Sequence, residues 1–344
     1  MCTQKLSFDY AHTLHTVRIV HNAHSVHRSR VQKGKSCDCI NFVRATDPTS
    51  GSGGMLIQSV DYIKSKGGNP NNLSLYGQEK NLNTWAICKM NLLLHGLSDH
   101  RIEKGDTIRD PKLTENGELM LFDRVIANPP YSLKNWGREE ASADEFGRFR
   151  FGLPPANAGD YAFVQHMLAT LNHTGKAGVV LPHGILFRGG AEGKIRQGLV
   201  KEDLIEAIIG LPANLFYGTG IPATIILYNK GKEEARQNKI FFIDASRDFQ
   251  EGKNQNVLRD EDVEKIVSTF DNYEVIEKYS RIVTLDEIKE NDYNLNISRY
   301  IDTTEEEEQI DVAKVIQELQ QLELEREKIE ETMYGFLKEL GYCE

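Results

Sequence analysis

A chain of 344 residues, 40% of them hydrophobic, is long enough to form one large α/β domain with a sizeable core. No run reaches the roughly 18 apolar residues that a membrane-spanning helix needs, so we expect no membrane contact and a cytoplasmic location. The five cysteines show no repeated Cys-x-x-Cys pair, which argues against a disulfide framework and predicts no metal site.

The net charge of −10 is concentrated in one segment of the chain. Residues 301–344 hold 14 acidic and 4 basic residues, whereas the rest of the chain balances at 37 of each. Residues 1–44 run the other way, with 7 basic residues against 2 acidic ones and five of the ten histidines. These counts assign the acidic character to the tail alone. The net charge of the whole chain, which would be unusual for a protein that handles nucleic acid, therefore says little about residues 1–300.

From about residue 42, short apolar runs alternate with longer amphipathic ones in the order strand, turn, helix. The first predicted strands are FVRATDP, LSLYGQE and LFDRVIANPPY, with helices GMLIQSVDYIKSKG and NTWAICKMNLLLHG after the first two. A helix ending at Gly175 precedes further strands at KAGVVLP, LIEAIIGLP, TIILYNKG and residues 239–246. Repeated units of this kind predict a doubly wound, mostly parallel α/β sheet that binds ligands at the carboxyl ends of its strands.

The chain divides into four segments. Residues 1–44 form an atypical N-terminal segment that we expect to be either disordered or mistranslated, and residues 45–245 form the sheet domain. Residues 246–300 are expected to be a charged, loop-rich connection, and residues 301–344 an acidic helix. In this helix, residues spaced as in a coiled-coil seam are Val312, Val315, Leu319, Leu322, Arg326, Ile329, Met333, Phe336 and Leu340. Two interpretations stay open, a helix that packs on its own domain and one that pairs with another subunit.

A glycine-rich turn, TDPTSGSGG at residues 46–54, follows the first predicted strand. Its glycines allow a tight turn and a close approach of the backbone to a ligand, at the start of a helix with free N–H groups. The turn lacks the lysine of a P-loop, and Leu56 breaks the dinucleotide fingerprint. With Asp47 ahead of it, the turn suits a cofactor with an amino-acid moiety, whose ammonium group a carboxylate can contact. A plain tight turn is the alternative.

Two acidic residues lie at the ends of the next predicted strands. Glu79 ends LSLYGQE and is placed to accept hydrogen bonds from both hydroxyls of a ribose. Asp106 follows a later strand and is placed to hold an adenine amino group. A surface acid is the alternative interpretation of each residue.

The stretch IANPPYSLKNW, residues 126–136, puts an amide, two prolines and an aromatic ring at a strand end. Pro129 and Pro130 end the strand, because neither offers an N–H to a neighbouring strand. The side-chain oxygen of Asn128 and the carbonyl of Pro129 can accept both hydrogens of a conjugated exocyclic amine, which localises the lone pair of its nitrogen. Tyr131 can stack on the ring that carries this amine. If the substrate is such an amine, which is a poor nucleophile toward a methyl sulfonium, the stretch supplies the groups that would activate it.

The NPPY tetrapeptide resembles the catalytic motif of S-adenosylmethionine-dependent amino-group methyltransferases, and DPTSGSGG resembles their cofactor loop. Five stretches together resemble the methylation (M) subunit of type I restriction-modification systems, an N6-adenine DNA methyltransferase. They are DPTSGSGGMLIQS, YGQEKNLNTWAICKMNLLLHG, FDRVIANPPYS, VVLPHGILFRGG and GLPANLFYGTGIPATIILYNK. The resemblance covers residues 46 to about 344. It implies the S-adenosylmethionine-dependent methyltransferase fold with a C-terminal helical appendage.

The resemblance also implies site residues, a cofactor and partners. The catalytic positions are Asn128, Pro129, Pro130 and Tyr131. The positions implied to bind S-adenosylmethionine are Asp47, Thr49, Ser50, Gly51, Ser52, Gly53 and Gly54 in the turn, with Glu79 at the ribose and Asp106 near the adenine. The implied partners are DNA, a specificity (S) subunit, a second M subunit and a restriction (R) subunit. Because this family leaves sequence reading to the S subunit, the lack of a basic recognition module is expected.

Three features depart from the family's pattern. Ser50 stands where the family often has cysteine, and no aromatic-x-Thr-Pro motif precedes Asp47. Residues 1–44 do not resemble the family's N-terminal helical domain, so we hypothesise a misread or frameshifted start, or a degraded gene. Two alternatives to a DNA methyltransferase stay open. One is a catalytically impaired assembly subunit, and the other is an NPPY methyltransferase that acts on RNA or on protein glutamine.

Overall fold

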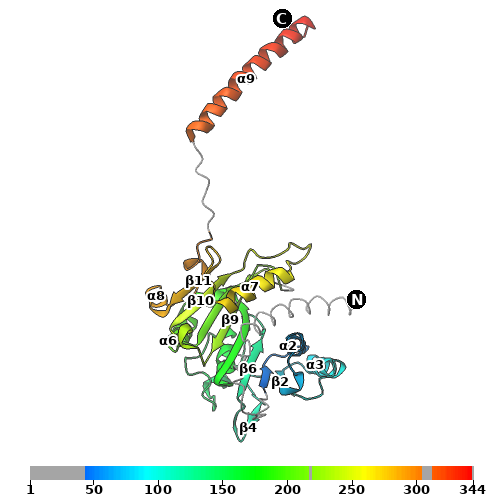
Figure 1. Cartoon of the computed structure of the whole chain (residues 1–344), viewed down its shortest axis with the longest axis vertical. Helices are drawn as coiled ribbons and strands as arrows, with labels where there is room; N and C mark the ends of the chain where they lie inside the picture. The colour runs from blue at the N-terminus through cyan, green and yellow to red at the C-terminus, as the bar shows by residue number, and fades with distance from the viewer. Residues whose placement is uncertain (1–42, 217–218, 304–311, 343–344) are drawn as a thin grey trace, which may run out of the picture. The chain divides into compact units, whose positions relative to one another are not determined.

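The computed structural model describes residues 43–216, 219–303 and 312–342 (Figure 1). It divides into two compact units, with the division between Asp302 and Thr303. The expectation for residues 1–44 falls almost entirely outside the described part of the chain. Its last two residues belong to the first strand, which starts two residues before the expected boundary.

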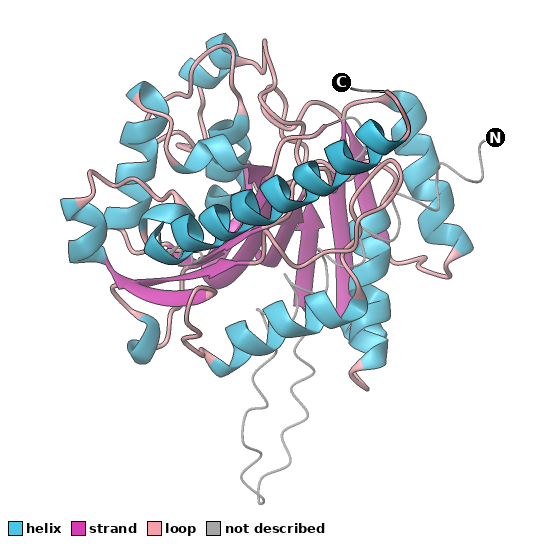
Figure 2. Ribbon diagram, turned by 90° about the horizontal axis from the view of Figure 1, so that it is seen from above, coloured by secondary structure: helices cyan, strands magenta, loops and turns pink. Residues whose placement is uncertain are grey.

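A mostly parallel nine-stranded sheet forms the centre of the first unit (Figures 1 and 2). Its strand order is β11-β10-β8-β9-β7-β6-β1-β2-β3. The bounds are β1 Val43–Asp47, β2 Leu73–Glu79, β3 His100–Lys104, β6 Phe122–Ala127, β7 Leu171–Pro182, β8 Ile205–Gly210, β9 Ala223–Asn229, β10 Lys239–Asp244 and β11 Ser280–Thr284. Strand β9 runs antiparallel between β7 and β8, and β11 runs antiparallel to β10. A separate small ribbon pairs β4 (Thr114–Glu115) with β5 (Glu118–Leu119).

Helices lie on both faces of this sheet (Figure 2). Their bounds are α2 Gly54–Ser65, α3 Leu82–Leu94, α4 Arg138–Ser142, α5 Asp160–Ala169, α6 Gly190–Lys201, α7 Asp260–Asn272 and α8 Leu285–Glu290. Short 3-10 turns occupy Pro70–Asn72, His183–Leu186, Glu234–Arg236 and Ile297–Arg299. This architecture confirms the doubly wound α/β sheet that the sequence predicts.

Alternate residues of the central strands pack into separate cores. In β10, Phe242 belongs to the core cluster that includes residues of α5 and α6, whereas its neighbour Phe241 belongs to the cluster that includes residues of α7. Side chains of a strand point alternately to its two faces, so both faces of the sheet are covered. This explains why strands such as β8, all six residues of which are buried, have apolar runs instead of an alternating pattern.

Helix α5 ends at Ala169, so the predicted helix end at Gly175 is wrong. Strand β7 already begins at Leu171, which pairs with Phe122 of β6 and is buried in the core with it. Pairing with a neighbouring strand and burial of Leu171 therefore override the helical pattern of the local sequence.

The segment 246–300 is not the loop-rich connection that the sequence predicts. It contains α7, α8 and β11, and β11 extends the sheet by pairing with β10. Helix α7 buries Val263, Ile266, Val267 and Phe270, which share one helical face. Charged residues on its other face hide this period in the sequence.

The second unit contains α9 (Val312–Glu339), the helix predicted in the acidic tail. The apolar seam side chains described as exposed are Val315, Leu319, Leu322, Ile329, Met333, Phe336 and Leu340. None of the described helices is both long and apolar enough to cross a membrane.

Candidate functional site

Four loops meet at the carboxyl ends of four neighbouring parallel strands, β3, β2, β1 and β6. Asp106 follows β3, Glu79 ends β2, the glycine-rich turn follows β1, and Asn128 follows β6. All site residues predicted from the sequence therefore lie on one edge of the sheet. The chain order of the strands reverses between β1 and β6, and open α/β sheets bind ligands at such a point.

The glycine-rich turn is held by the carboxylate at its start and packs closely on α3. The Thr49 N–H donates to Asp47 Oδ1 at 2.9 Å. Gly51 and Gly53 have φ of 52° and 82°, in the left-handed region that favours glycine. A Cβ on Gly53 would lie 2.9 Å from Cys88 Sγ. No side chain caps the start of α2, which leaves N–H groups of its first turn facing the same edge.

Burial raises the pKa of Asp47 to about 7. The residue is 2% exposed, and loss of hydration disfavours its charged form. Hydrogen bonds from Thr49 oppose this effect, and the nearby charge of Glu79 adds to it. A cation bound beside Asp47 would favour the charged form, so the position suits a positively charged ligand.

Glu79 joins two of the loops. Its Oε2 accepts a hydrogen bond from the Gly51 N–H at 3.1 Å, and its Oε1 accepts one from the Asn81 N–H at 2.7 Å. A carboxylate has about four lone-pair positions, so the Glu79 carboxylate retains acceptor capacity for a ligand.

Asp106 is paired with two cations. Its Oδ2 lies 2.9 Å from Lys80 Nζ and 2.9 Å from Arg109 Nη1. Partial burial opposes its charged form, but the hydrogen bonds from Lys80 and Arg109 outweigh that effect and hold the pKa of Asp106 below its usual range. Arg109 also donates to the Asn135 carbonyl and to Glu140. This arginine therefore links the loop after β3 to the segment that follows β6.

The NPPY residues combine an open amide with a fixed ring. Asn128 is exposed, and its side chain makes no hydrogen bond with any residue in the described part of the chain. Pro129 is buried. Tyr131 packs edge-on against Phe216, with 6.4 Å between ring centroids. The Tyr131 hydroxyl is buried without a partner among the described residues, and burial raises its pKa, so the phenol stays neutral.

Arg148 supports the loop that carries Asp106, and the sequence did not indicate this role. Its guanidinium donates to the carbonyls of Thr107 and Ile108 at 3.0 and 2.8 Å, and to Asp144 at 2.7 Å. The side chains of Arg148 and Asp144 are both buried, so the pair fixes the loop that carries Asp106. Arg148 and Thr107 are 41 residues apart, and no local pattern in the sequence marks this contact.

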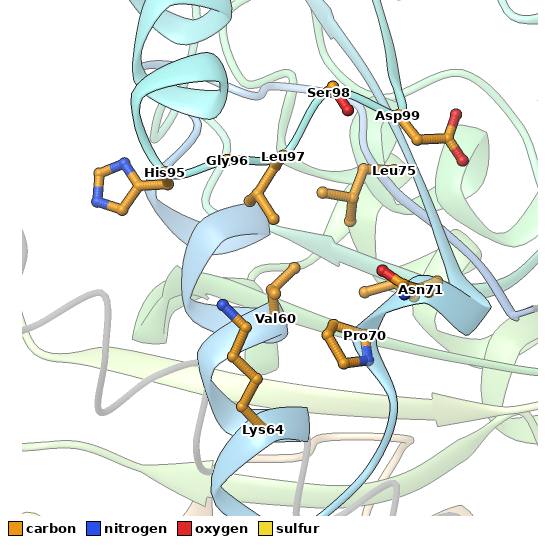
Figure 3. Close-up of a pocket in the computed structure, with 11 residues that line it drawn as sticks. Val60, Lys64, Pro70, Asn71, Leu75, His95, Gly96, Leu97, Ser98 and Asp99 are labelled. Atoms are coloured by element: carbon orange, nitrogen blue, oxygen red, sulfur yellow. The ribbon is translucent and has the colours of Figure 1, made fainter.

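A cavity of about 370 Å³ lies at the other end of the strands (Figure 3). Val60, Leu75 and Leu97 line it, with Lys64 and His95 at its rim. Leu75 lies in the first half of β2, whereas Glu79 ends that strand, so the cavity is not part of the candidate site.

One protein-family model matches most of this chain. The model of the N-6 DNA Methylase family matches residues 40–309, which include all four loops of the site. The chain belongs to the N-6 DNA methylase family. The match begins just before β1 and ends just after the first structural unit.

Two similar proteins are named as methylase subunits of type I restriction enzymes. The chain is 41% identical over 303 residues to the type I restriction enzyme MjaVII methylase subunit of Methanocaldococcus jannaschii, covering 85% of this chain and 51% of that protein. It is 35% identical over 276 residues to the HindI methylase subunit of Haemophilus influenzae, covering 77% of this chain and 60% of that protein. The chain thus spans about half of the length of these relatives.

A solved structure supports the fold. The type I restriction-modification methyltransferase subunit from Streptococcus thermophilus aligns with a TM-score of 0.73 at 35% identity. The alignment covers 83% of this chain and 58% of that one. The methyltransferase fold expected from the resemblance is therefore confirmed.

Proposed function

We propose that this chain transfers a methyl group from S-adenosylmethionine to the N6 amine of adenine in DNA, as the modification subunit of a type I restriction-modification complex in the cytoplasm. The observation that carries the proposal is the position of Asn128–Tyr131 at the end of β6, next to the glycine-rich turn after β1. Membership of the N-6 DNA methylase family supports it.

The residues around the turn fit S-adenosylmethionine. Asp47 is buried with a raised pKa, and the cofactor's ammonium group would stabilise its charged form. Glu79 keeps acceptor capacity for the two ribose hydroxyls. Gly51 and Gly53 let the backbone approach closely. Asp106 already accepts hydrogen bonds from the backbone N–H groups of Ile108 and Arg109 and from the side chains of Arg109 and Lys80, so it would hold the adenine amino group in place of the exposed Lys80. The bound cofactor supplies an electrophilic methyl carbon on a sulfonium.

The residues after β6 would prepare the acceptor. Adenine N6 is a poor nucleophile, because its lone pair is conjugated with the ring. Asn128 Oδ1 and the Pro129 carbonyl would accept its two N–H groups and localise the lone pair on the nitrogen. Tyr131 would stack on the adenine, which has to leave the DNA duplex to reach this edge. Chemistry of this kind requires position and hydrogen bonding and no nucleophilic side chain.

Helix α9 supports an assembly role for the second unit. Its exposed apolar residues repeat at heptad spacing, and they include Leu322, Ile329 and Phe336. Such a seam fits the apolar face of a helix from another subunit. We propose that the S subunit is this partner and reads the DNA sequence, and that a second M subunit and an R subunit complete the complex.

Transfer of a labelled methyl group tests the proposed activity. The chain, with and without a type I S subunit, is given S-adenosylmethionine labelled on the methyl group together with DNA, RNA or a glutamine-containing peptide. We expect label in DNA. Label only in RNA or peptide contradicts the proposal, and so does the absence of label in DNA when the S subunit is present, whether or not calorimetry shows cofactor binding.

A charge placed in the α9 seam tests the assembly role. Leu322→Glu puts a carboxylate on the apolar face, and we expect loss of co-purification with the S subunit while cofactor binding is unchanged. Glu323→Gln, on the adjacent residue, is the control. Equal association of Leu322→Glu and the unmodified chain contradicts this role for α9.

A further inference from the structure

The backbone directly after the NPPY motif is held in an unfavourable conformation. Ser132 has a φ of 47°, in the left-handed region that non-glycine residues seldom adopt. Such a conformation persists only where the surrounding structure holds it. The Ser132 N–H donates to Asp160 Oδ1 at 2.8 Å, and this bond spans 28 residues of sequence.

Asp160 is the first residue of α5 and is fully buried. Its second oxygen, Oδ2, faces Arg188 Nη1 at 3.3 Å. Arg188 also lies 3.7 Å from Glu192 Oε1, and its side chain is 36% exposed. Each oxygen of the buried carboxylate thus has one partner, a backbone N–H of the site loop on one side and a cation on the other. A buried carboxylate needs such partners, because burial disfavours its charged form.

The N-cap of α5 and the segment before it hold the same loop at two more points. The Gly159 N–H donates to the Leu133 carbonyl at 3.1 Å, and the Trp136 indole N–H donates to the Pro155 carbonyl at 2.8 Å. A Cβ on Gly159 would lie 2.7 Å from the Trp136 Cβ, so the two segments are in tight contact. The loop after Tyr131 therefore takes its position from α5.

We propose that Asp160 is a positioning residue for the methyl transfer, which it serves by fixing the backbone that follows Tyr131. This inference rests on the proposed function. Asp160 itself does not touch the substrate. It fixes the end of the Asn128–Tyr131 segment, so the Asn128 amide and the Pro129 carbonyl meet the acceptor amine in one geometry. Arg188 serves as the counter-ion of the buried carboxylate.

The role predicts a separation of rate from binding. Asp160 forms hydrogen bonds with Ser132, in the loop after β6, and with Arg188. It forms none with the glycine-rich turn, Glu79 or Asp106. Loss of Asp160 should therefore lower kcat and leave cofactor affinity unchanged. A misplacement of about 1 Å in an active site can lower the rate about a hundredfold, and Asp160→Ala should cause a loss of that order.

Three variants of the full chain, assayed with an S subunit and DNA, test this role. Asp160→Ala removes both contacts. Asp160→Asn keeps an oxygen that can accept from the Ser132 N–H and should restore most of the rate. Glu192→Gln changes the other carboxylate near Arg188, has no contact with the loop, and should match the unmodified chain. If the alanine variant does not fold, Asp160→Ser replaces it, because its oxygen is one bond too short to reach Ser132.

Hydrogen exchange gives a readout that does not depend on activity. In Asp160→Ala, the peptide covering residues 131–137 should exchange faster than in the unmodified chain, with the cofactor dissociation constant unchanged. Unchanged exchange in this peptide overturns the proposal, and so does an Asp160→Asn variant as slow as Asp160→Ala. If the unmodified chain binds cofactor but methylates no DNA, the proposed function fails, whereas faster exchange would still show that Asp160 fixes the loop.

Discussion

The two halves of the site differ in what holds their polar groups. In the cofactor half, defined as the loops after β1, β2 and β3, the carboxylates of Asp47, Glu79 and Asp106 already accept hydrogen bonds from the protein. In the acceptor half, defined as Asn128–Tyr131 after β6, the Asn128 amide is exposed and unbonded within the described residues. The cofactor half is preformed, whereas the acceptor half keeps its amide open within a rigid backbone.

This difference fits the division of work in a methyl transfer. A preformed half binds its ligand without spending free energy on loop ordering. An open amide on a fixed backbone forms its strongest hydrogen bonds only when the acceptor amine changes geometry, which is where they accelerate the reaction. Mutations in the two halves should therefore change different quantities.

Asn128→Ala should have the largest effect. Removing one preorganised hydrogen-bonding group lowers kcat on the order of 10²–10³-fold, and we expect a loss of this size in methyl transfer to DNA. Cofactor affinity, measured by calorimetry, should stay unchanged. Asn71→Ala, an exposed asparagine at the opposite end of the strands, is the matched control. An equal loss in cofactor affinity would remove the proposed distinction between the halves.

Asp47→Asn should raise the stability of the cofactor-free chain in a pH-dependent way. The folded-state pKa of Asp47 is raised from 3.8 to about 7, so the folded chain loses stability as the pH rises from about 4 through 7. The asparagine variant escapes this loss, and its advantage should approach about 4 kcal/mol at pH 8 and be small near pH 4. Denaturant unfolding at several pH values measures it.

The same variant should weaken cofactor binding, because asparagine carries no negative charge and cannot form an ion pair with an ammonium group. Stability and affinity then move in opposite directions at Asp47, as expected of a residue that serves binding. If Asp47→Asn gains no stability at pH 8, the free-energy cost that we assign to the buried charge of Asp47 is wrong.

Glu79→Gln should have a smaller effect, confined to the cofactor half. The amide NH₂ of glutamine cannot accept a hydrogen bond, so one of the bonds from Gly51 and Asn81 is lost. We expect a loss of about 1.4 kcal/mol in binding free energy, which corresponds to a tenfold larger dissociation constant for the cofactor. The kcat at saturating cofactor should not change. Glu103→Gln on the neighbouring strand is the control, and a fall in kcat at constant affinity would contradict this assignment.

The sequence predicted the parts of the molecule that depend on local pattern. The first strands and their helices follow from apolar periodicity, and the glycine-rich turn and Asn128–Tyr131 are contiguous motifs. Parallel strands place all their carboxyl ends on one edge, so the meeting of these motifs was also predictable. The fold and the family followed from these features together.

The parts that the sequence did not predict depend on contacts between distant residues. Asp160 and Ser132 are 28 residues apart, and Arg148 contacts a carbonyl 41 residues away. Asp106 is paired with Lys80 across two loops, which its own strand end does not indicate. Helix α7 was missed because its charged face obscured four buried apolar residues. Tertiary packing decides such features, and no local signal carries them.

The identity of the methylated base tests the central claim most directly. DNA treated with the chain, an S subunit and labelled S-adenosylmethionine is digested to nucleosides, which are separated and identified by mass spectrometry. We predict that the label appears in N6-methyladenine and that Asn128→Ala reduces it on the order of 10²–10³-fold. Label in a methylated cytosine, or equal N6-methyladenine from Asn128→Ala, would contradict the assignment of this site.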